Sequence, residues 1–286
     1  MELGLKIEDA VKLNRELQKY VFYKNGKAKL NFKNKEALYL YNKTILKYLF
    51  GLNMEFHKDA LIPTPINRYL FVKNVFENYN KDILNANNDI VKENVKNIKY
   101  DNNNHHPIKT VLEIGTGSAI ISIIMAKYYH CNIYATETVK EYINIANENT
   151  LKNNLNNYIM VINSNNKIIK GITNLTHKKF DLIISYPPFY DSNSVPSKRS
   201  FGGAHATDIE LIGGGKYGEE FSLKIIEEGV NHLNKGGLIA LMFPHKPMER
   251  RKAVMDKIKD SGLMLKTYEI KTGKRIRHII KGYNIK

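Results

Sequence analysis

The regular alternation of short apolar segments with helical segments from Lys109 onward most constrains the fold. Short apolar runs bounded by turn residues predict buried strands, and the longer stretches between them have helical length and spacing. This alternation predicts an α/β fold with a doubly wound, seven-stranded sheet and an antiparallel last strand. The expected strands are 110–114, 131–136, 158–162, the run that begins at Phe180, 237–243, 264–271 and 276–283, and the expected helices are 119–129, a segment ending near Asn149, 219–234 and 247–261.

A basic amino-terminal segment precedes this pattern. The spacing of its apolar residues predicts an amphipathic helix over about 3–17 and a second helix over 37–50, which Gly51 ends. Residues 1–60 are therefore expected to form a small, basic, mainly helical module.

A second domain, 61–286, is expected to carry the sheet. It opens with a proline-stiffened segment and a helix over about 68–79. Residues 80–107 are rich in Asn and Lys, which is typical of a helix fragment followed by a low-complexity linker.

Positive charge is concentrated at the two ends of the chain. The formal net charge is +16; residues 1–50 carry 11 Lys and Arg against 5 Asp and Glu, and residues 245–286 carry 13 against 4. The middle, 51–244, carries 20 against 19 and is nearly neutral. A lysine-rich composition alone would spread the charge evenly. Basic ends around a neutral middle favour a catalytic core whose flanks hold a polyanion such as nucleic acid.

Several other classes of protein are disfavoured. A single cysteine, Cys131, excludes an internal disulfide framework and a cysteine-based zinc cluster. No apolar run is long enough to cross a bilayer, and the first residues do not resemble a signal peptide. The adjacent His105 and His106 lack the spacing of a metal motif. A cytoplasmic location, no membrane partner and no metal are therefore expected.

The fourth expected strand leaves the sheet in an unusual way. Its apolar run ends at Tyr186-Pro187-Pro188-Phe189. Because proline has no amide hydrogen for a central ladder, the chain must leave the sheet at Pro187, at a strand's carboxyl end, where ligands of open α/β sheets bind. The two prolines restrict the backbone and hold Phe189 as a platform for a flat substrate. The same pattern also fits a proline turn whose aromatic rings pack inward.

A glycine turn follows the first strand of the sheet. Gly115-Thr116-Gly117 lets the backbone approach a ligand at a helix amino terminus. Glu137 ends the next strand and can bind two ribose hydroxyls. This pair fits dinucleotide and S-adenosylmethionine sites alike, but the acid Glu113 suits an ammonium group better than a pyrophosphate and favours the latter. Further cofactor contacts are expected from Thr138, Asn163 and Ser164.

Together, the glycine turn, Glu137 and the Tyr-Pro-Pro-Phe motif resemble the class I methyltransferases that act on planar amides or exocyclic amines. Other segments resemble the methyltransferase-like protein 16 family, which includes the bacterial large-subunit ribosomal RNA adenine-N6 methyltransferase: 30–37, 50–52, 61–64 with Arg68, and 114–117. This resemblance covers most of residues 20–286. It implies a Rossmann-like class I fold and a monomer that methylates the N6 amine of an adenosine in structured RNA, ribosomal or other, from S-adenosylmethionine.

The resemblance also implies roles for individual cofactor-binding residues. Gly115 and Gly117 would line the methionine half of S-adenosylmethionine, and Glu137 would bind its ribose. Arg68 matches a family arginine near the carboxylate of the cofactor.

At the substrate end, the resemblance implies that Phe189 stacks on a flipped base and that the Pro187 carbonyl helps to receive the amine. Tyr186 and Pro188 complete this catalytic motif. The RNA is expected to contact the basic residues Lys27, Lys29, Lys33, Lys198, Arg199, Lys274, Arg275 and Arg277.

Tyr186 departs from the family, which has Asn at this position. In the usual site an amide oxygen and a proline carbonyl accept the two hydrogens of the amine. A tyrosine hydroxyl can also accept, but from further out on a bulky ring. Two alternatives therefore stay open. One is a protein methyltransferase that acts on a glutamine amide, as the release-factor enzymes do. The loop 213–221 of this chain resembles a loop of those enzymes. The other is an RNA-binding protein with a decayed site.

Overall fold

The main sheet of the computed structural model has seven strands in the order β5-β4-β3-β6-β7-β9-β8. The structure describes residues 3–57, 59–87, 107–193, 195, 206–273 and 275–285. β9 is antiparallel to β7 and β8 while the other neighbouring pairs are parallel, which confirms the predicted sheet with an antiparallel last strand. The strands are β3 (Thr110–Ile114), β4 (Asn132–Glu137), β5 (Ile159–Asn163), β6 (Phe180–Ser185), β7 (Leu233–Pro244), β8 (Met264–Thr272) and β9 (Arg275–Tyr283).

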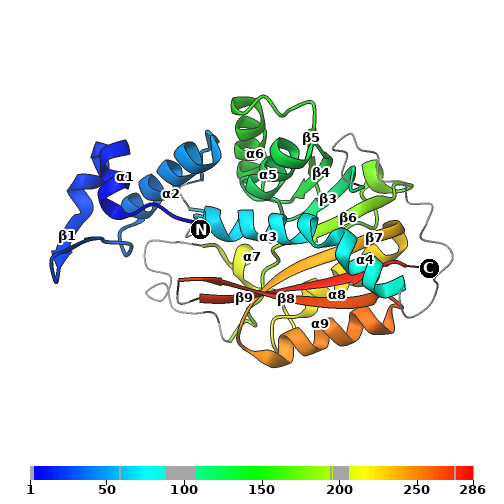
Figure 1. Ribbon diagram of the computed structural model, residues 1–286. Coiled ribbons are helices and arrows are strands. Elements are labelled where there is room, and N and C mark those ends of the chain that lie inside the picture. The colour runs from blue at the N-terminus through cyan, green and yellow to red at the C-terminus, as the bar shows by residue number, and fades with distance from the viewer. Residues whose placement is uncertain are drawn as a thin grey trace.

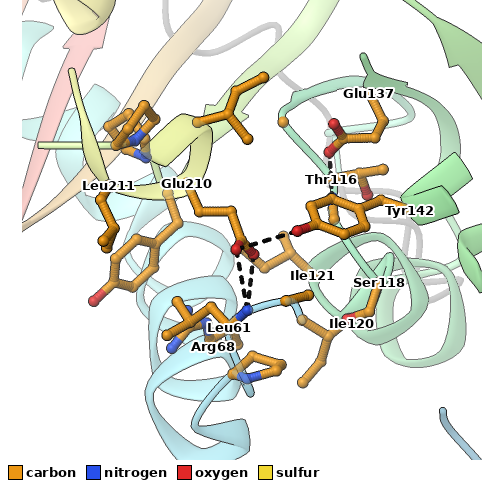
Figure 2. Close-up of a pocket in the computed structure, with 18 of the residues that line it drawn as sticks. Leu61, Arg68, Thr116, Ser118, Ile120, Ile121, Glu137, Tyr142, Glu210 and Leu211 are labelled. Atoms are coloured by element: carbon orange, nitrogen blue, oxygen red, sulfur yellow. Dashed lines mark hydrogen bonds between the residues drawn. The ribbon is translucent and has the colours of Figure 1, made fainter. Parts of the chain in front are cut away.

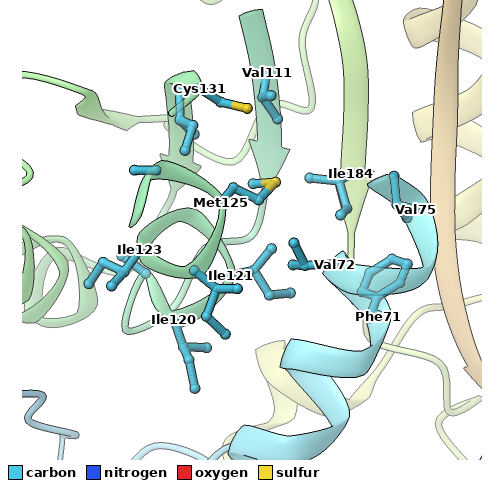
Figure 3. Close-up of a cluster of buried hydrophobic side chains, with 14 of the residues drawn as sticks. Phe71, Val72, Val75, Val111, Ile120, Ile121, Ile123, Met125, Cys131 and Ile184 are labelled. Atoms are coloured by element: carbon cyan, nitrogen blue, oxygen red, sulfur yellow. The ribbon is translucent and has the colours of Figure 1, made fainter. Parts of the chain in front are cut away.

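Helices cover both faces of this sheet (Figure 1). Val111 and Ile184 point to the face that packs against α3 and α5, as Figure 3 shows, whereas Leu112 and Ile183 belong to the cluster on the other face with α8 and α9. Burial on both faces explains why the parallel strands are continuous apolar runs rather than alternating ones. The helices are α3 (Pro65–Glu77), α5 (Ile120–Tyr129), α6 (Lys140–Lys152), α8 (Glu220–Gly229) and α9 (Met248–Asp260).

The connections of β3 and β6 create the crevice that a doubly wound sheet offers to ligands. These two strands are parallel neighbours, with Glu113 opposite Ile184. The chain continues from β3 to α5 on one face and from β6 to α8 on the other face. The two exits therefore diverge at the carboxyl edge, which is the topological switch point where ligands of such sheets bind.

Some element boundaries differ from those predicted. α3 begins at Pro65 rather than near residue 68, because proline at the first helical position lacks only an amide hydrogen that would have no partner there. α8 ends at Gly229, and the short 3₁₀ helix Val230–His232 leads into β7, which begins at Leu233.

The amino-terminal segment contains a β-hairpin that was not predicted. α1 (Ile7–Leu13) and the 3₁₀ helix Arg15–Tyr20 precede β1 (Val21–Lys24) and β2 (Lys27–Leu30), and α2 (Lys35–Phe50) follows. Asn25 and Gly26 both have positive φ, which is the geometry of a two-residue hairpin turn. Figure 1 shows these elements projecting to one side of the sheet. The boundary near residue 60 stays a prediction, since Leu46 and Phe50 of α2 belong to the large core that includes α3.

A buried polar cluster fastens α4 (Tyr79–Asn87) to the last two strands. Asp82 accepts hydrogen bonds from the Tyr283 hydroxyl at 2.6 Å, from the Lys281 ammonium at 3.3 Å and from the Tyr268 hydroxyl. Lys281 is fully buried, and burial lowers its pKa to about 8 against the opposing effect of Asp82. The predicted insert therefore starts as an anchored helix, while residues 88–106 lie outside the described residues. Among the described helices, none is long and apolar enough to cross a membrane.

Candidate functional site

A cavity of about 910 Å³ lies at the carboxyl ends of β3, β4 and β6 (Figure 2). It is walled by the sheet edge, by α2 and α3 and by the loop after β6. Of the predicted cofactor and catalytic residues, Asn163 does not line this cavity; its side chain accepts a hydrogen bond from the Asn165 amide at 2.9 Å. The lining includes Arg68, Glu113, Gly115, Thr116, Gly117, Glu137, Thr138, Ser164, Tyr186, Pro187, Pro188 and Phe189.

The glycine turn presents bare backbone to the cavity. Gly115 and Gly117 have φ values of +72° and +56°, which side chains rarely adopt, and a Cβ built on either would meet nothing within 4 Å. The Gly115 and Thr116 amides donate to the Thr136 carbonyl at 3.0 and 2.9 Å, which fixes the turn against β4. The open space beside both glycines fits a ligand that lies directly against the backbone.

Glu113 is a buried acid on β3 with an exposed fraction of 2%. Its Oε2 accepts hydrogen bonds from the Thr116 hydroxyl at 2.8 Å, from the Ser122 amide at 3.0 Å and from the Ser122 hydroxyl. Burial raises the pKa of Glu113 to about 7, although these hydrogen bonds oppose the shift. A carboxylate held in this way can bind a cationic group such as the ammonium of S-adenosylmethionine.

We expect the affinity for S-adenosylmethionine to rise by roughly an order of magnitude between pH 5.5 and pH 7, because the cofactor's ammonium favours the ionised form of Glu113, whose pKa is about 7. The affinity rises with pH because cofactor binding displaces the proton that Glu113 carries at low pH. Above about pH 8 the cofactor's own amino group loses its charge, so the window ends there. Equilibrium dialysis against pH would measure this rise.

The Glu113→Gln variant is the control for this titration. Its amide keeps an acceptor for Thr116 and Ser122 but has no proton to lose, so its affinity should be weaker and flat over the same range. A wild-type affinity that does not change with pH would contradict the assigned role of Glu113.

Glu137 sits at the end of β4 with an exposed fraction of 8%. Its Oε2 accepts a hydrogen bond from the Gly117 amide at 2.9 Å, and its Oε1 accepts hydrogen bonds from the amides of Thr138 and Val139 at 2.7 and 3.0 Å. Three backbone donors fix the carboxylate and leave part of its acceptor capacity for ribose hydroxyls. The Ser164 amide donates to the Glu137 carbonyl at 2.8 Å, so β5 supports the same corner.

The loop after β6 is fastened by the segment around residues 211–218. The amides of Phe189 and Tyr190 both donate to the Leu211 carbonyl, at 3.1 and 2.8 Å. A Cβ at Gly213 would lie 2.6 Å from the Pro188 carbonyl oxygen, and one at Gly218 would overlap the Phe189 carbonyl. Gly213 and Gly218 are therefore needed because only residues without a Cβ can approach the Pro188 and Phe189 carbonyls this closely.

Tyr186 lies between two arginines. The Arg68 guanidinium is 4.3 Å from the centre of the Tyr186 ring, and Arg277 Nε donates a 3.0 Å hydrogen bond to the Tyr186 hydroxyl. Arg68 is 9% exposed, and burial lowers its pKa, as does the nearby charge of Arg277. An arginine keeps its charge in spite of such a shift. The ring is thus oriented by contacts that an asparagine in this position would not make.

Phe189 is half-buried and lines the cavity, with Arg250 behind it. The Arg250 guanidinium lies 5.3 Å from the Phe189 ring centre and 6.0 Å from that of Tyr190. Its Nε donates to the Tyr217 carbonyl at 2.6 Å, and the side chain is only 2% exposed. Arg250, which belongs to α9, therefore supports the Phe189 ring, and no local sequence pattern indicated this role.

Glu210 is a second residue that sequence reasoning missed. Its carboxylate accepts the Leu61 amide at 3.0 and 3.1 Å and the Tyr142 hydroxyl at 3.3 Å, as Figure 2 shows. It also forms a capping box with Thr207. That Thr-x-x-Glu spacing was the available signal. Glu210 joins the segment before α3 to α6 and so closes one side of the cavity.

The predicted RNA-binding residues lie in different places. Lys27, Lys29 and Lys33 are exposed on and after the amino-terminal hairpin. Arg275 and Arg277 line the cavity. Phe32, which follows β2, also lines it, so the amino-terminal segment reaches the site. Lys198, Arg199 and Lys274 lie outside the described residues.

Comparisons with known proteins identify a family that this chain resembles. The profile of a family described as RNA methyltransferase matches residues 6–202. A protein of Methanocaldococcus jannaschii with a provisional methyltransferase name is 55% identical over 281 residues, which are 98% of either chain.

Two more distant relatives carry more specific names. The U6 small nuclear RNA (adenine-(43)-N(6))-methyltransferase of Drosophila pseudoobscura pseudoobscura is 31% identical over 174 residues; the match covers 59% of this chain and 50% of that one, so the chain spans about half of this relative. The catalytic domain of human METTL16, solved with a MAT2A 3′UTR hairpin, superimposes with a TM-score of 0.75 at 19% identity and covers 99% of this chain and 92% of that domain. At this identity, the likeness concerns the fold.

Proposed function

The chain belongs to the RNA methyltransferase family, and from this premise we propose that it methylates the N6 amine of an adenosine in structured RNA. S-adenosylmethionine is the cofactor of this class of enzyme. The observation that carries the proposal is the shared cavity: the glycine turn, Glu137 and the Tyr186–Phe189 motif all line one space of about 910 Å³. The relative that modifies an adenine N6 in U6 RNA supports the choice of acceptor.

The residues at the cofactor end fit S-adenosylmethionine. Open backbone at Gly115 and Gly117 would lie against its methionine half, Glu113 offers a carboxylate for the ammonium, and Glu137 offers one for the ribose. Arg68 is a buried cation that interacts electrostatically with Glu113, and it suits the carboxylate of the cofactor. When bound, the cofactor supplies a methyl group on a positively charged sulfur.

At the substrate end, the motif would orient the amine. Phe189 stacks on the extruded base, and the Pro187 carbonyl accepts one hydrogen of the N6 amine. The Tyr186 hydroxyl accepts the other, because its oxygen has two lone pairs and Arg277 uses one of them. Both acceptors would raise electron density on nitrogen. The new carbon–nitrogen bond would form as the carbon–sulfur bond breaks, and the proton would then pass from nitrogen to water.

The basic hairpin would hold the flanking phosphates. Replacing Lys27, Lys29 and Lys33 by glutamine should weaken RNA binding and lower the slope of log affinity against log salt by about 2 to 3 units, at roughly 0.7 to 0.9 per lost phosphate contact. Filter binding over a range of salt concentrations measures this slope.

A control with the same loss of charge is available at the opposite edge of the sheet. Lys109, Lys179 and Lys235 are exposed at the amino ends of β3, β6 and β7. Replacing these three by glutamine should leave the slope near that of the wild type. An equal effect of both triple variants would mean that only net charge matters.

The direct test incubates the purified chain with methyl-labelled S-adenosylmethionine and total RNA, followed by nucleoside analysis. The expected product is labelled N6-methyladenosine. Label in a protein glutamine with unlabelled RNA would instead support the release-factor type of activity. RNA retention without cofactor binding or label would indicate a decayed site. We propose that a single chain is the active unit.

A further inference from the structure

A cluster of two histidines and one glutamate lies on the sheet away from the cavity. His278 is on β9, directly opposite Glu269 on β8 and Phe243 on β7. His245 follows two residues after Phe243. Directly opposed residues and residues two apart share one face of a sheet, so the three side chains lie on the same face. None of them lines the described cavity.

That face is the one covered by α9, not the one that holds the arginines of the site. Phe243 and Ile280 belong to the cluster that packs against α9. Arg277, one residue from His278, lies instead on the cavity side, where it contacts Tyr186. The three side chains therefore lie on the opposite face of the sheet from Arg277, although Pro244, the residue before His245, lines the cavity.

The ligand atoms of the cluster already converge. His245 Nδ1 lies 2.8 Å from His278 Nε2, and Glu269 Oε2 lies 3.9 Å from His278 Nε2. One ligand atom from each of the three residues falls within 4.8 Å of the others. With metal–nitrogen bonds of about 2.0–2.1 Å in a tetrahedral site, ligand atoms are roughly 3.3 Å apart, so small side-chain shifts would accommodate an ion.

The donor set selects a class of ion. Two imidazoles and one carboxylate suit Zn²⁺, Co²⁺ or Ni²⁺, whereas Mg²⁺ and Ca²⁺ require oxygen ligands. Arg251 of α9 interacts electrostatically with His278 and Glu269 and contributes a positive charge nearby. Hard cations such as Mg²⁺ and Ca²⁺ are bound mainly through negatively charged oxygen ligands, and this site has a single carboxylate beside an arginine. Its affinity would therefore come mainly from the imidazole nitrogens.

We propose that His245, Glu269 and His278 form a binding site for one divalent transition-metal ion of the Zn²⁺ class. The ion would join the end of β7 to β8 and to β9, the strand that supplies Arg275 and Arg277 to the cavity. Its role is to stabilise this corner of the sheet, and it takes no part in methyl transfer. No sequence motif indicated the site, because the ligands come from three separate segments.

The test uses the full chain, stripped of metal with a chelator and titrated with Zn²⁺ by calorimetry. His105 and His106 are replaced by alanine in every protein compared, so that this adjacent pair cannot add a second site. The expected result is one bound ion per chain, a visible absorption spectrum when Co²⁺ replaces Zn²⁺, and a rise in the melting temperature. Mg²⁺ should give none of these effects.

Variants of the ligands decide the assignment. His278→Ala and His245→Ala should each weaken Zn²⁺ binding at least about 100-fold and abolish the Co²⁺ spectrum, since even the outer partners of metal ligands change affinity by roughly 10- to 100-fold. His177→Ala removes an exposed histidine elsewhere and should change nothing. Circular dichroism of the metal-free proteins establishes that each variant is folded. If the parent protein, in which only His105 and His106 are replaced, bound no Zn²⁺, or if His177→Ala caused an equal loss, the proposal would be overturned and only a hydrogen-bonded histidine pair would remain.

Discussion

Replacing Phe189 by alanine is expected to lower methyl transfer to RNA by about two orders of magnitude while cofactor affinity stays within about twofold of the wild type. Stacking of a base on an aromatic ring contributes about 1–3 kcal/mol, and an unstacked base also loses its alignment with the methyl donor. The Phe189 ring lines the cavity, whereas the cofactor is assigned to the glycine turn and Glu137 on neighbouring strands. Steady-state kinetics with labelled cofactor and equilibrium dialysis measure the two quantities.

Phe189→Tyr is the matched control, because it keeps the aromatic ring and should retain most of the activity. The denaturation midpoints of both variants show whether the loop stays fastened to Leu211 and Arg250. If Phe189→Ala lost cofactor binding and methyl transfer equally, the ring would be a support of the fold rather than a platform for the base.

Replacing Tyr186 by phenylalanine is expected to lower the turnover number about 100-fold with little change in cofactor affinity. The variant keeps a ring for Arg68 to lie against but removes the hydroxyl that Arg277 orients at 3.0 Å. Losing one fixed hydrogen-bonding partner of a transition state costs about 10²- to 10³-fold in comparable enzymes. Single-turnover kinetics with saturating cofactor separates this effect from binding.

Tyr158→Phe, an exposed tyrosine at the end of the sheet near β5, provides the control and should be fully active. Tyr186→Asn adds a second comparison, since it restores the residue common in the resembled family but removes the ring contacted by Arg68. Full activity of Tyr186→Phe would show that the hydroxyl is not an acceptor. An asparagine variant faster than the wild type would mean that Tyr186 slows the reaction.

Local patterns were sufficient to predict the sheet and most of the residues that line the cavity at its carboxyl edge. Each strand is a short apolar run with turn residues at both ends, so β3, β4 and β6 were found near their observed bounds. Gly115 and Gly117 have positive φ, and a proline pair follows β6. At these positions the residue type alone therefore predicts the backbone conformation. The edge at which ligands bind then followed from the general topology of doubly wound sheets.

Contacts between distant segments were not predictable in this way. The hairpin at Asn25-Gly26 has a turn signal, but its strands β1 and β2 are short and mostly exposed, so their periodicity was weak. Arg250 contacts Phe189 across 61 positions of sequence, and Glu210 reaches Leu61 across 149. Nothing in either residue's local sequence specifies its partner.

The sequence by itself determined the class of fold, the edge of the sheet that bears the cavity and the motif that ends β6, because these depend on apolar periodicity, glycine and proline, whose effects act within a few residues. Only the tertiary structure decided which residues contact Tyr186. Arg68 comes from α3 and Arg277 from β9, and folding brings both to one ring. Side-chain chemistry at that distance depends on which helices and strands become neighbours, and that is set by packing of the whole sheet rather than by any local stretch of the chain.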